Sequence, residues 1–166
     1  MINVKKEGVI LTKTATGFDN DGVLNPAVIM EDGLIHLFYR AVRKGNYSSI
    51  GYCNMISPLL INERSNTPVL YPQFDYESQG VEDPRIVKIE DMYYMSYTAY
   101  DGVNALGALA VSKDLLHFDK LGLIAPQFTY EEFSHLAEAK GAINEKYLRF
   151  NEHEQVKEKH GKKIFV

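Results

Sequence analysis

Short apolar runs separated by turn residues follow one another along residues 22–121 of this chain. Pairs such as Asp32-Gly33 and Glu90-Asp91 lie between the runs and are turn signals. Two of the runs are rich in aromatic residues, which favour strands. We therefore expect strands at residues 27–30, 34–39, 49–53, 59–61, 86–89, 92–97, 106–111 and 117–121.

The eight runs form two copies of one pattern. The segment from Gly22 to Ile29 resembles the segment from Gly80 to Val87, and the offset is 80 − 22 = 58 positions. The same offset, kept without a gap, places Leu37 to Ala41 over Met95 to Ala99. A constant offset of this size indicates a repeated supersecondary unit.

Each copy contains four short strands joined by tight turns, which is the pattern of one blade of a β-propeller. The sequence therefore predicts an all-β chain, with a first blade over about residues 22–72 and a second blade over about residues 80–125. The alternative is a meandering β-sandwich in which the resemblance between the two copies is a coincidence.

The residues after the second copy have a different character. Thr129 to Glu132 has the spacing of a capping box and predicts a helix from Glu131 to about Ala139. Residues 138–163 are dense in charge and lack apolar periodicity, so we expect a helical and charged segment between blades over about residues 129–163. Ile164 to Val166 resembles the start of another strand.

Two blades leave unpaired faces and edges and cannot close a propeller ring. We therefore expect residues 1–166 to be the N-terminal part of a single propeller domain that belongs to a longer protein. The alternative is that other subunits supply the missing blades, so a homo-oligomer stays open.

The charge of the chain excludes several classes of function. Eighteen Lys and Arg against 22 Asp and Glu give a net charge of −4, which offers no attraction for nucleic acid or an anionic membrane. No apolar run approaches the roughly 18 residues of a membrane helix, and the first residues show no secretory signal.

Cys53 is the only cysteine, and the five histidines lack metal-ligand spacing. We expect no disulfide, no metal site and a cytoplasmic location.

The two proline-containing turns are the candidate site, because the innermost strand of each propeller blade lines the central channel. Asn25 and Asp83 occupy equivalent positions in the two copies, so both are expected to point into one pocket. Strand alternation places Asp83 and Arg85 on one side and Glu82 on the other. A carboxylic acid in a sugar-sized pocket can protonate a glycosidic oxygen. The alternative is that Asp83 caps the turn and pairs with Arg85.

An ordered series of motifs within about residues 22–125 resembles the β-mannoside phosphorylases and β-mannosidases of glycoside hydrolase family 130. The motifs are Asn25-Pro26, Tyr39-Arg40-Ala41, Gly80-Val81-Glu82-Asp83-Pro84-Arg85, Tyr97-Thr98-Ala99-Tyr100-Asp101-Gly102 and Ser112-Lys113-Asp114-Leu115. The resemblance implies a five-bladed β-propeller with its active site at the central cavity, of which this chain covers about the first two blades.

The resemblance also implies roles for individual residues. Asp83, in the Glu-Asp-Pro-Arg motif, is expected to be the proton donor, which in phosphorylases acts through a hydroxyl of the mannosyl unit. Inorganic phosphate, the co-substrate, then attacks the anomeric carbon with inversion and gives mannose 1-phosphate, a glycosyl transfer that needs no cofactor. Further substrate contacts are implied at Asn25, Arg40, Arg85, Tyr100 and Asp101.

The first turn bears on the type of reaction. Related five-bladed glycosidases carry a carboxylate there as base or nucleophile, whereas this chain has Asn25. An amide is no base at pH 7, so a nucleophile that is already anionic is needed, which favours phosphate. A β-mannosidase, for example one acting on β-1,2-mannosides, is the alternative, as is a non-catalytic carbohydrate-binding or truncated propeller. We expect the phosphate-binding residues beyond Val166 and the 166-residue chain to be inactive alone.

Overall fold

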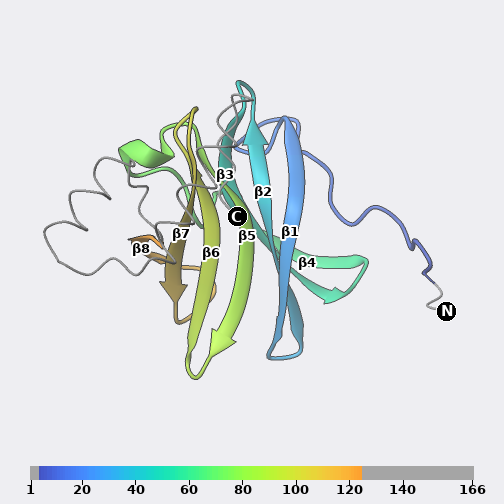
Figure 1. Cartoon of the computed structure of the whole chain (residues 1–166). Coiled ribbons are helices and arrows are strands. Elements are labelled where there is room, and N and C mark those ends of the chain that lie inside the picture. The colour runs from blue at the N-terminus through green and yellow to red at the C-terminus, as the bar shows by residue number, and fades with distance from the viewer. Residues whose placement is uncertain (1–3, 125–166) are drawn as a thin grey trace, which may run out of the picture. The chain divides into compact units, whose positions relative to one another are not determined.

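The structure is a computed structural model that describes residues 4–124, and these residues form an all-β fold, as the sequence predicts. Residues 4–124 contain no helix with the length and apolar composition that crossing a membrane requires. The strands, labelled in Figure 1, are β1 (Gly22–Glu31), β2 (Leu34–Arg43), β3 (Tyr47–Ser57), β4 (Leu60–Arg64), β5 (Gly80–Ile89), β6 (Met92–Tyr100), β7 (Ala105–Ser112) and β8 (Asp119–Leu123). A short 3₁₀ helix, η1 (Asp75–Glu77), lies between β4 and β5. The helix expected from Glu131, the charged segment over 129–163 and the strand at 164–166 lie outside the described residues.

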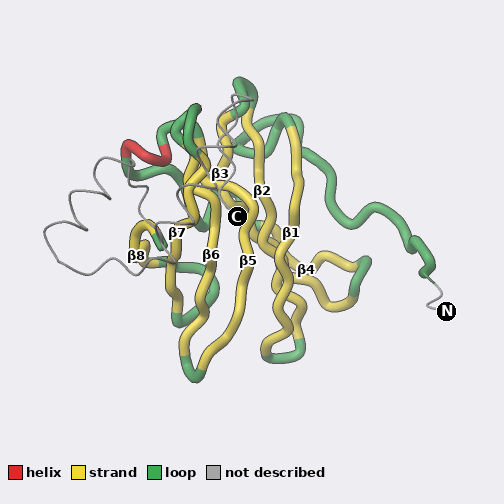
Figure 2. Tube along the Cα trace, viewed as in Figure 1, coloured by secondary structure: helices red, strands yellow, loops and turns green. Residues whose placement is uncertain are grey.

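The strands form two antiparallel meanders, β1-β2-β3-β4 and β5-β6-β7-β8 (Figure 2). A single parallel pair, Ser48 on β3 with Gly80 on β5, joins the two meanders into one open sheet. Each copy of the sequence repeat therefore folds into one four-stranded antiparallel meander, which is the blade that the repeat predicts.

The turn before β8 moves the start of that strand from His117 to Asp119. Asp114 Oδ1 accepts hydrogen bonds from the backbone N–H groups of Leu116, at 2.9 Å, and His117, at 2.8 Å. These N–H groups are therefore unavailable to a neighbouring strand. Burial raises the pKa of Asp114, but hydrogen bonds from His117, Leu116 and Ser112 outweigh this effect and hold the pKa below its ordinary value.

The same backbone irregularity occurs at the inner strand of both blades. The register shifts between Leu24 and Ala27 in β1 and between Glu82 and Arg85 in β5, which marks a β-bulge in each strand. Asn25 and Asp83 lie within the bulges at φ 44° and φ 50°, in the left-handed region that Asn and Asp tolerate best. A proline follows each of them. Because proline has no backbone N–H, the break in strand pairing at the bulge leaves no hydrogen-bond donor unpaired at this position.

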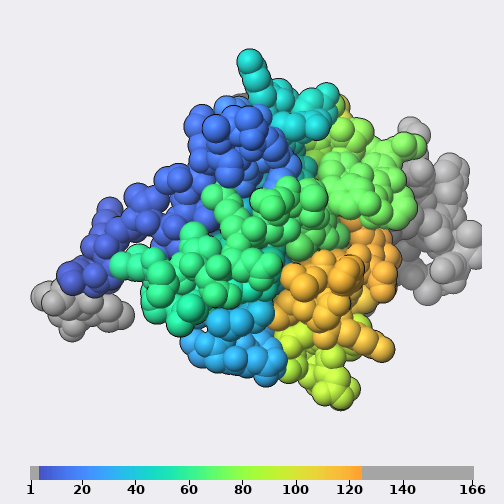
Figure 3. All heavy atoms as spheres, turned by 180° about the vertical axis from the view of Figure 1, so that it is seen from behind, coloured from blue at the N-terminus to red at the C-terminus, as the bar shows by residue number. Residues whose placement is uncertain are grey.

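The main hydrophobic core lies between the two blades. Phe38 and Tyr52 of the first blade pack in one buried cluster with Met95 and Tyr97 of the second. The ring of Phe38 meets that of Phe118, before β8, edge to face at 5.7 Å. Seen from behind, the blue-green residues of the first blade and the orange residues around β8 lie side by side (Figure 3). Burial of these aromatic side chains holds the two blades in a fixed relation.

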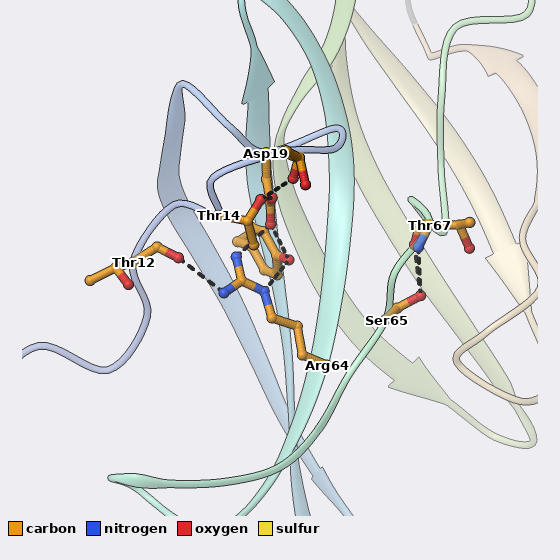
Figure 4. Close-up of polar contacts among 8 residues, drawn as sticks. Thr12, Thr14, Asp19, Arg64, Ser65 and Thr67 are labelled. Atoms are coloured by element: carbon orange, nitrogen blue, oxygen red, sulfur yellow. Dashed lines mark hydrogen bonds and ion pairs between the residues drawn. The ribbon is translucent and has the colours of Figure 1, made fainter.

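A second core lies on the opposite face of the first blade and is covered by the N-terminal segment. Leu11 and Phe18 pack there against buried side chains of β2 and β3. Arg64 fixes the segment by donating to the Thr12 carbonyl oxygen at 3.0 Å and to the Asp19 carboxylate (Figure 4). Asp19 is almost fully buried, so this ion pair ties residues 12–19 to the sheet.

Tyr39 completes this polar cluster from β2. Its hydroxyl donates to Asp19 Oδ2 at 3.1 Å and accepts from Arg64 Nε at 3.2 Å. The ring lies so close to Gly51 that a Cβ at that position would come within 2.3 Å of Tyr39 Cζ. Only glycine fits at position 51 with the ring in this place.

We expect the chain to lose stability as the pH rises from about 10 to about 12. Burial raises the pKa of Tyr39 from 10.0 to about 12, because it outweighs the opposing effect of Arg64. In this range the folded state keeps a proton that the unfolded state releases, so the stabilisation is complete below pH 10 and is lost through pH 12. Chemical denaturation at a series of pH values measures the fall. Tyr39→Phe cannot titrate and should make the fall shallower; an unchanged slope in this variant would show that Tyr39 is not responsible.

Candidate active site

The side chains of Asn25 and Asp83 meet at the inner edge of the two blades. Asn25 Nδ2 donates a hydrogen bond of 2.6 Å to Asp83 Oδ1. The two equivalent bulges of β1 and β5 position the pair, so the structure brings together the two residues that the repeat places at corresponding positions. Asn25 is exposed and Asp83 is half-buried, which leaves both side chains accessible to a ligand.

A second contact between the blades lies directly beside this pair. Arg40 on β2 is the cross-strand partner of Leu24, and its Nη2 lies 2.6 Å from Oε1 of Glu82 on β5. The N–H groups do not point at Glu82 Oε1 in hydrogen-bond geometry, so the contact is an ion pair. Arg40 Nε donates to Ser48 Oγ on β3 at 2.9 Å. The Arg40 guanidinium is therefore held from two sides.

Strand alternation gives the wrong faces for the acidic motif. Glu82 pairs with Thr98 and Arg85 pairs with Ser96, so the bulge inserts one residue and puts Glu82 and Arg85 on the same face. Arg85 is exposed, and its Nη1 donates to the carbonyl oxygen of Pro84 at 2.7 Å. Arg85 and Asp83 form no ion pair with each other in the structure, because Asp83 bonds Asn25 across the blades instead.

Tyr100 and Asp101 lie at the turn between β6 and β7. Asp101 Oδ1 accepts from the backbone N–H groups of Val103, at 2.8 Å, and Asn104, at 2.7 Å. Hydrogen bonds from Asn104 and Val103 lower the pKa of the Asp101 carboxyl. The Tyr100 hydroxyl donates to the carbonyl oxygen of Gly102 at 2.9 Å. The polar groups of both residues thus stabilise the turn, and their contact with a substrate stays a prediction.

Glu82 is the one charged residue of this site for which the sequence predicts no role. Strand alternation predicts Glu82 on the side opposite to Asp83 and Arg85, whereas the register places Glu82 and Arg85 on the same face and Glu82 contacts Arg40. The repeat contains a signal that could have identified Glu82. At the offset of 58, Glu82 corresponds to Leu24, and Arg40 corresponds to Thr98. The two charges therefore occur only in the residues that meet across the blades.

The arrangement limits the chemistry of the site. Asp83 is the one side chain of the Asn25–Asp83 pair that can give or take a proton at a glycosidic bond. Arg40 and Arg85 are the two cations among the implied substrate contacts, and the charge of Arg40 is already balanced by Glu82. Within residues 4–124, no group of three or more His, Cys, Asp or Glu side chains is arranged to hold a metal ion.

A cavity in the described part of the chain lies away from these residues. It has a volume of about 630 Å³ and is lined by residues of the outer strands β3 and β4, of the segment over residues 65–73, and of residues 116–119 at the start of β8. None of Asn25, Arg40, Glu82 and Asp83 lines it. The candidate site is therefore defined by its side chains and not by this cavity.

Gly80 sets how closely the two blades approach beside the site. A Cβ on Gly80 would come within 2.8 Å of Ser48 Cβ and 3.0 Å of Ser48 N, so a larger residue must push β3 and β5 apart. We expect Gly80→Ala to lower the free energy of unfolding by about 1–3 kcal/mol. Gly22 is its counterpart in the repeat, and a Cβ there meets Val42 at an ordinary 3.8 Å. Equal losses for Gly80→Ala and Gly22→Ala in urea denaturation would rule out this explanation.

Comparison with known proteins identifies the family. A family model described as β-1,4-mannooligosaccharide phosphorylase matches residues 9–161. The chain belongs to glycoside hydrolase family 130. Its two four-stranded meanders correspond to the first blades of the five-bladed propeller of this family, as the sequence predicts.

Two curated relatives of this family 130 chain come from Thermoanaerobacter sp. (strain X514). The chain is 32% identical over 138 residues to a 1,2-β-oligomannan phosphorylase, covering 75% of this chain and 46% of the relative. It is 42% identical over 99 residues to a β-1,2-mannobiose phosphorylase, covering 51% and 32%. The chain therefore spans less than half the length of each of these relatives.

A solved structure extends the comparison to hydrolysis. It comes from work described as showing that the family of mannoside phosphorylases contains glycoside hydrolases that target β-1,2-mannosidic linkages in Candida mannan. Its TM-score to this chain is 0.55 at 31% sequence identity, over 75% of this chain and 39% of that one. Family 130 thus includes both phosphorylases and hydrolases of mannosides.

Proposed function

We propose that this family 130 chain supplies the proton donor of an enzyme that cleaves β-mannosides by phosphorolysis. The observation that carries the proposal is the 2.6 Å hydrogen bond between Asn25 and Asp83, which joins an amide and an acid at the inner edges of two successive blades. The relatives named as β-1,2-mannoside phosphorylases support the class of substrate. A cytoplasmic location and a homo-oligomeric state stay predictions from the sequence.

In this reaction Asp83 gives a proton, through a hydroxyl of the mannosyl unit, to the glycosidic oxygen. An oxygen of hydrogen phosphate forms a bond to the anomeric carbon from the opposite face while the bond to the leaving oxygen breaks. The products are mannose 1-phosphate with inverted configuration and a sugar with a free hydroxyl. The proton that hydrogen phosphate loses balances the one that Asp83 gives up. We assign Asn25, Arg40 and Arg85 to the sugar.

The nature of Asn25 favours phosphate over water as the nucleophile. Water needs a base to remove its proton, and the amide at position 25 cannot serve as one. Arg40 is paired with Glu82, so its charge is not free to bind an anion. We therefore place the phosphate site in residues outside the two described blades, and we expect the 166-residue chain to be inactive by itself.

A β-mannosidase is the second candidate, and the similarity to the structure described for β-1,2-mannoside hydrolases favours it. Its base would also come from outside the two described blades. A non-catalytic carbohydrate-binding propeller is the third.

Incubating the full-length enzyme with β-mannobiose isomers, with and without phosphate, separates these candidates. We expect mannose 1-phosphate to form only when phosphate is present. Free mannose without phosphate would favour the mannosidase. Binding of mannobiose without turnover would favour the carbohydrate-binding propeller.

A further inference from the structure

We propose that Glu82 is a positioning residue that holds the Arg40 guanidinium in the mannosyl site and neutralises its charge. This inference rests on the proposed function. Glu82 lies next to the β-bulge in β5, pairs in regular register with Thr98, and reaches Arg40 of the first blade beside Asp83. Asp83 itself already bonds Asn25, so the two adjacent acids have different partners.

The geometry supports a fixed guanidinium. Arg40 Nη2 lies 2.6 Å from Glu82 Oε1, and Arg40 Nε donates to Ser48 Oγ at 2.9 Å. The side chains of Arg40 and Glu82 are only 18% and 13% exposed, so solvent screens their attraction weakly. Among residues 4–124, Arg40 donates a hydrogen bond only through Nε, so the N–H groups of Nη1 and Nη2 remain for hydroxyls of a sugar. An arginine held from two sides loses less freedom when a ligand binds.

The charge of Glu82 also decides what kind of ligand Arg40 accepts. An unpaired guanidinium at the site attracts anions, because Arg binds phosphate and sulfate bidentately. Paired with Glu82, Arg40 donates hydrogen bonds without net charge, which suits neutral sugar hydroxyls. Glu82 therefore keeps inorganic phosphate from occupying the place of the mannosyl unit.

The repeat shows that this pair is an addition to the common blade pattern. The counterparts of Glu82 and Arg40 in the other copy are Leu24 and Thr98, neither of which carries a charge. The ion pair is therefore not required by the blade itself. It occurs only where the first blade meets the second, beside the Asn25–Asp83 contact.

The test is Glu82→Gln in the full-length enzyme, assayed with β-mannobiose. We expect KM to rise roughly tenfold with a smaller change in kcat, the scale of one hydrogen bond lost between a misplaced Arg40 and the sugar. Sulfate, used as an unreactive anion, should become a competitive inhibitor against mannobiose in this variant and not in the wild type. In an Arg40→Met background, Glu82→Gln should have no further effect on KM, because Glu82 acts through Arg40.

Glu31→Gln is the matched control. It removes another ion pair between the two blades, in which Lys88 Nζ on β5 lies 2.7 Å from Glu31 Oε1 on β1, and should change neither KM nor sulfate inhibition. If Glu82→Gln does not fold, Glu82→Asp keeps the charge on a shorter side chain and should raise KM without sulfate inhibition. Unchanged KM and absent sulfate inhibition in a Glu82→Gln enzyme that turns over mannobiose would overturn the inference alone. A wild-type enzyme that cleaves no mannoside would overturn the proposed function, and the inference with it.

Discussion

Asp83→Asn is expected to lower β-mannobiose turnover by the full-length enzyme by about 10²–10⁴-fold, the usual contribution of a general acid. The amide cannot give up a proton at the leaving oxygen. Its Oδ1 can still accept the hydrogen bond from Asn25 Nδ2, and asparagine tolerates the left-handed backbone at φ 50°. Steady-state kinetics should therefore show the loss in kcat, while the thermal midpoint stays close to that of the wild type.

Asp91→Asn is the matched control for this prediction. Asp91 lies at the exposed turn between β5 and β6, so the same chemical change there tests only the effect of losing one negative charge. We expect normal turnover in this variant. Near-normal turnover in Asp83→Asn as well would show that Asp83 is not the proton donor.

Glu77→Ala is expected to cause a larger loss of stability than Gly80→Ala. The Glu77 side chain is fully buried and lies 2.5 Å from Lys120 Nζ, whose side chain is 3% exposed. Glu77 also accepts hydrogen bonds from the Tyr97 hydroxyl at 2.7 Å and the Gln73 N–H at 2.8 Å. These contacts tie the linker between the blades to β6 and β8 of the second blade.

Removing Glu77 leaves a buried ammonium without its carboxylate. Burial already lowers the pKa of Lys120, and Glu77 is the group that opposes this effect. Breaking a buried ion pair by deleting one partner costs about 3–5 kcal/mol. Urea denaturation of Glu77→Ala measures this loss, and Glu31→Ala, which breaks the more exposed pair with Lys88, should leave the midpoint nearly unchanged. Similar midpoints for the two variants would contradict the assignment.

The repeat is the reason that much of this fold and site follows from the sequence. A constant offset compares each residue with a counterpart in the same chain, so it identifies both the strands and the correspondence of Asn25 with Asp83. Asn-Pro and Asp-Pro also carry the signal of the bulges, because both residues before the prolines adopt positive φ. Alternation fails at Glu82 and Arg85 because it assumes an unbroken strand, and a bulge adds one residue.

Other contacts leave no local pattern in the sequence. Glu77 and Lys120 are 43 positions apart, and Asp19 and Arg64 are 45 apart. Neither pair falls at the repeat offset of 58 or at the spacing of neighbours on a strand or helix. They form because chain segments that cover a blade need their buried polar groups paired. Only the folded structure brings such charges together.

The most direct measurement is a crystal structure of the full-length Asp83→Asn variant with β-1,2-mannobiose, because slow turnover should preserve the bound sugar. We expect oxygens of the mannosyl unit within about 2.6–3.2 Å of the side chains at positions 25 and 83, with Arg40 donating to the same unit. A disaccharide that touches neither position, for example one bound in the 630 Å³ cavity between the outer strands, would contradict the site.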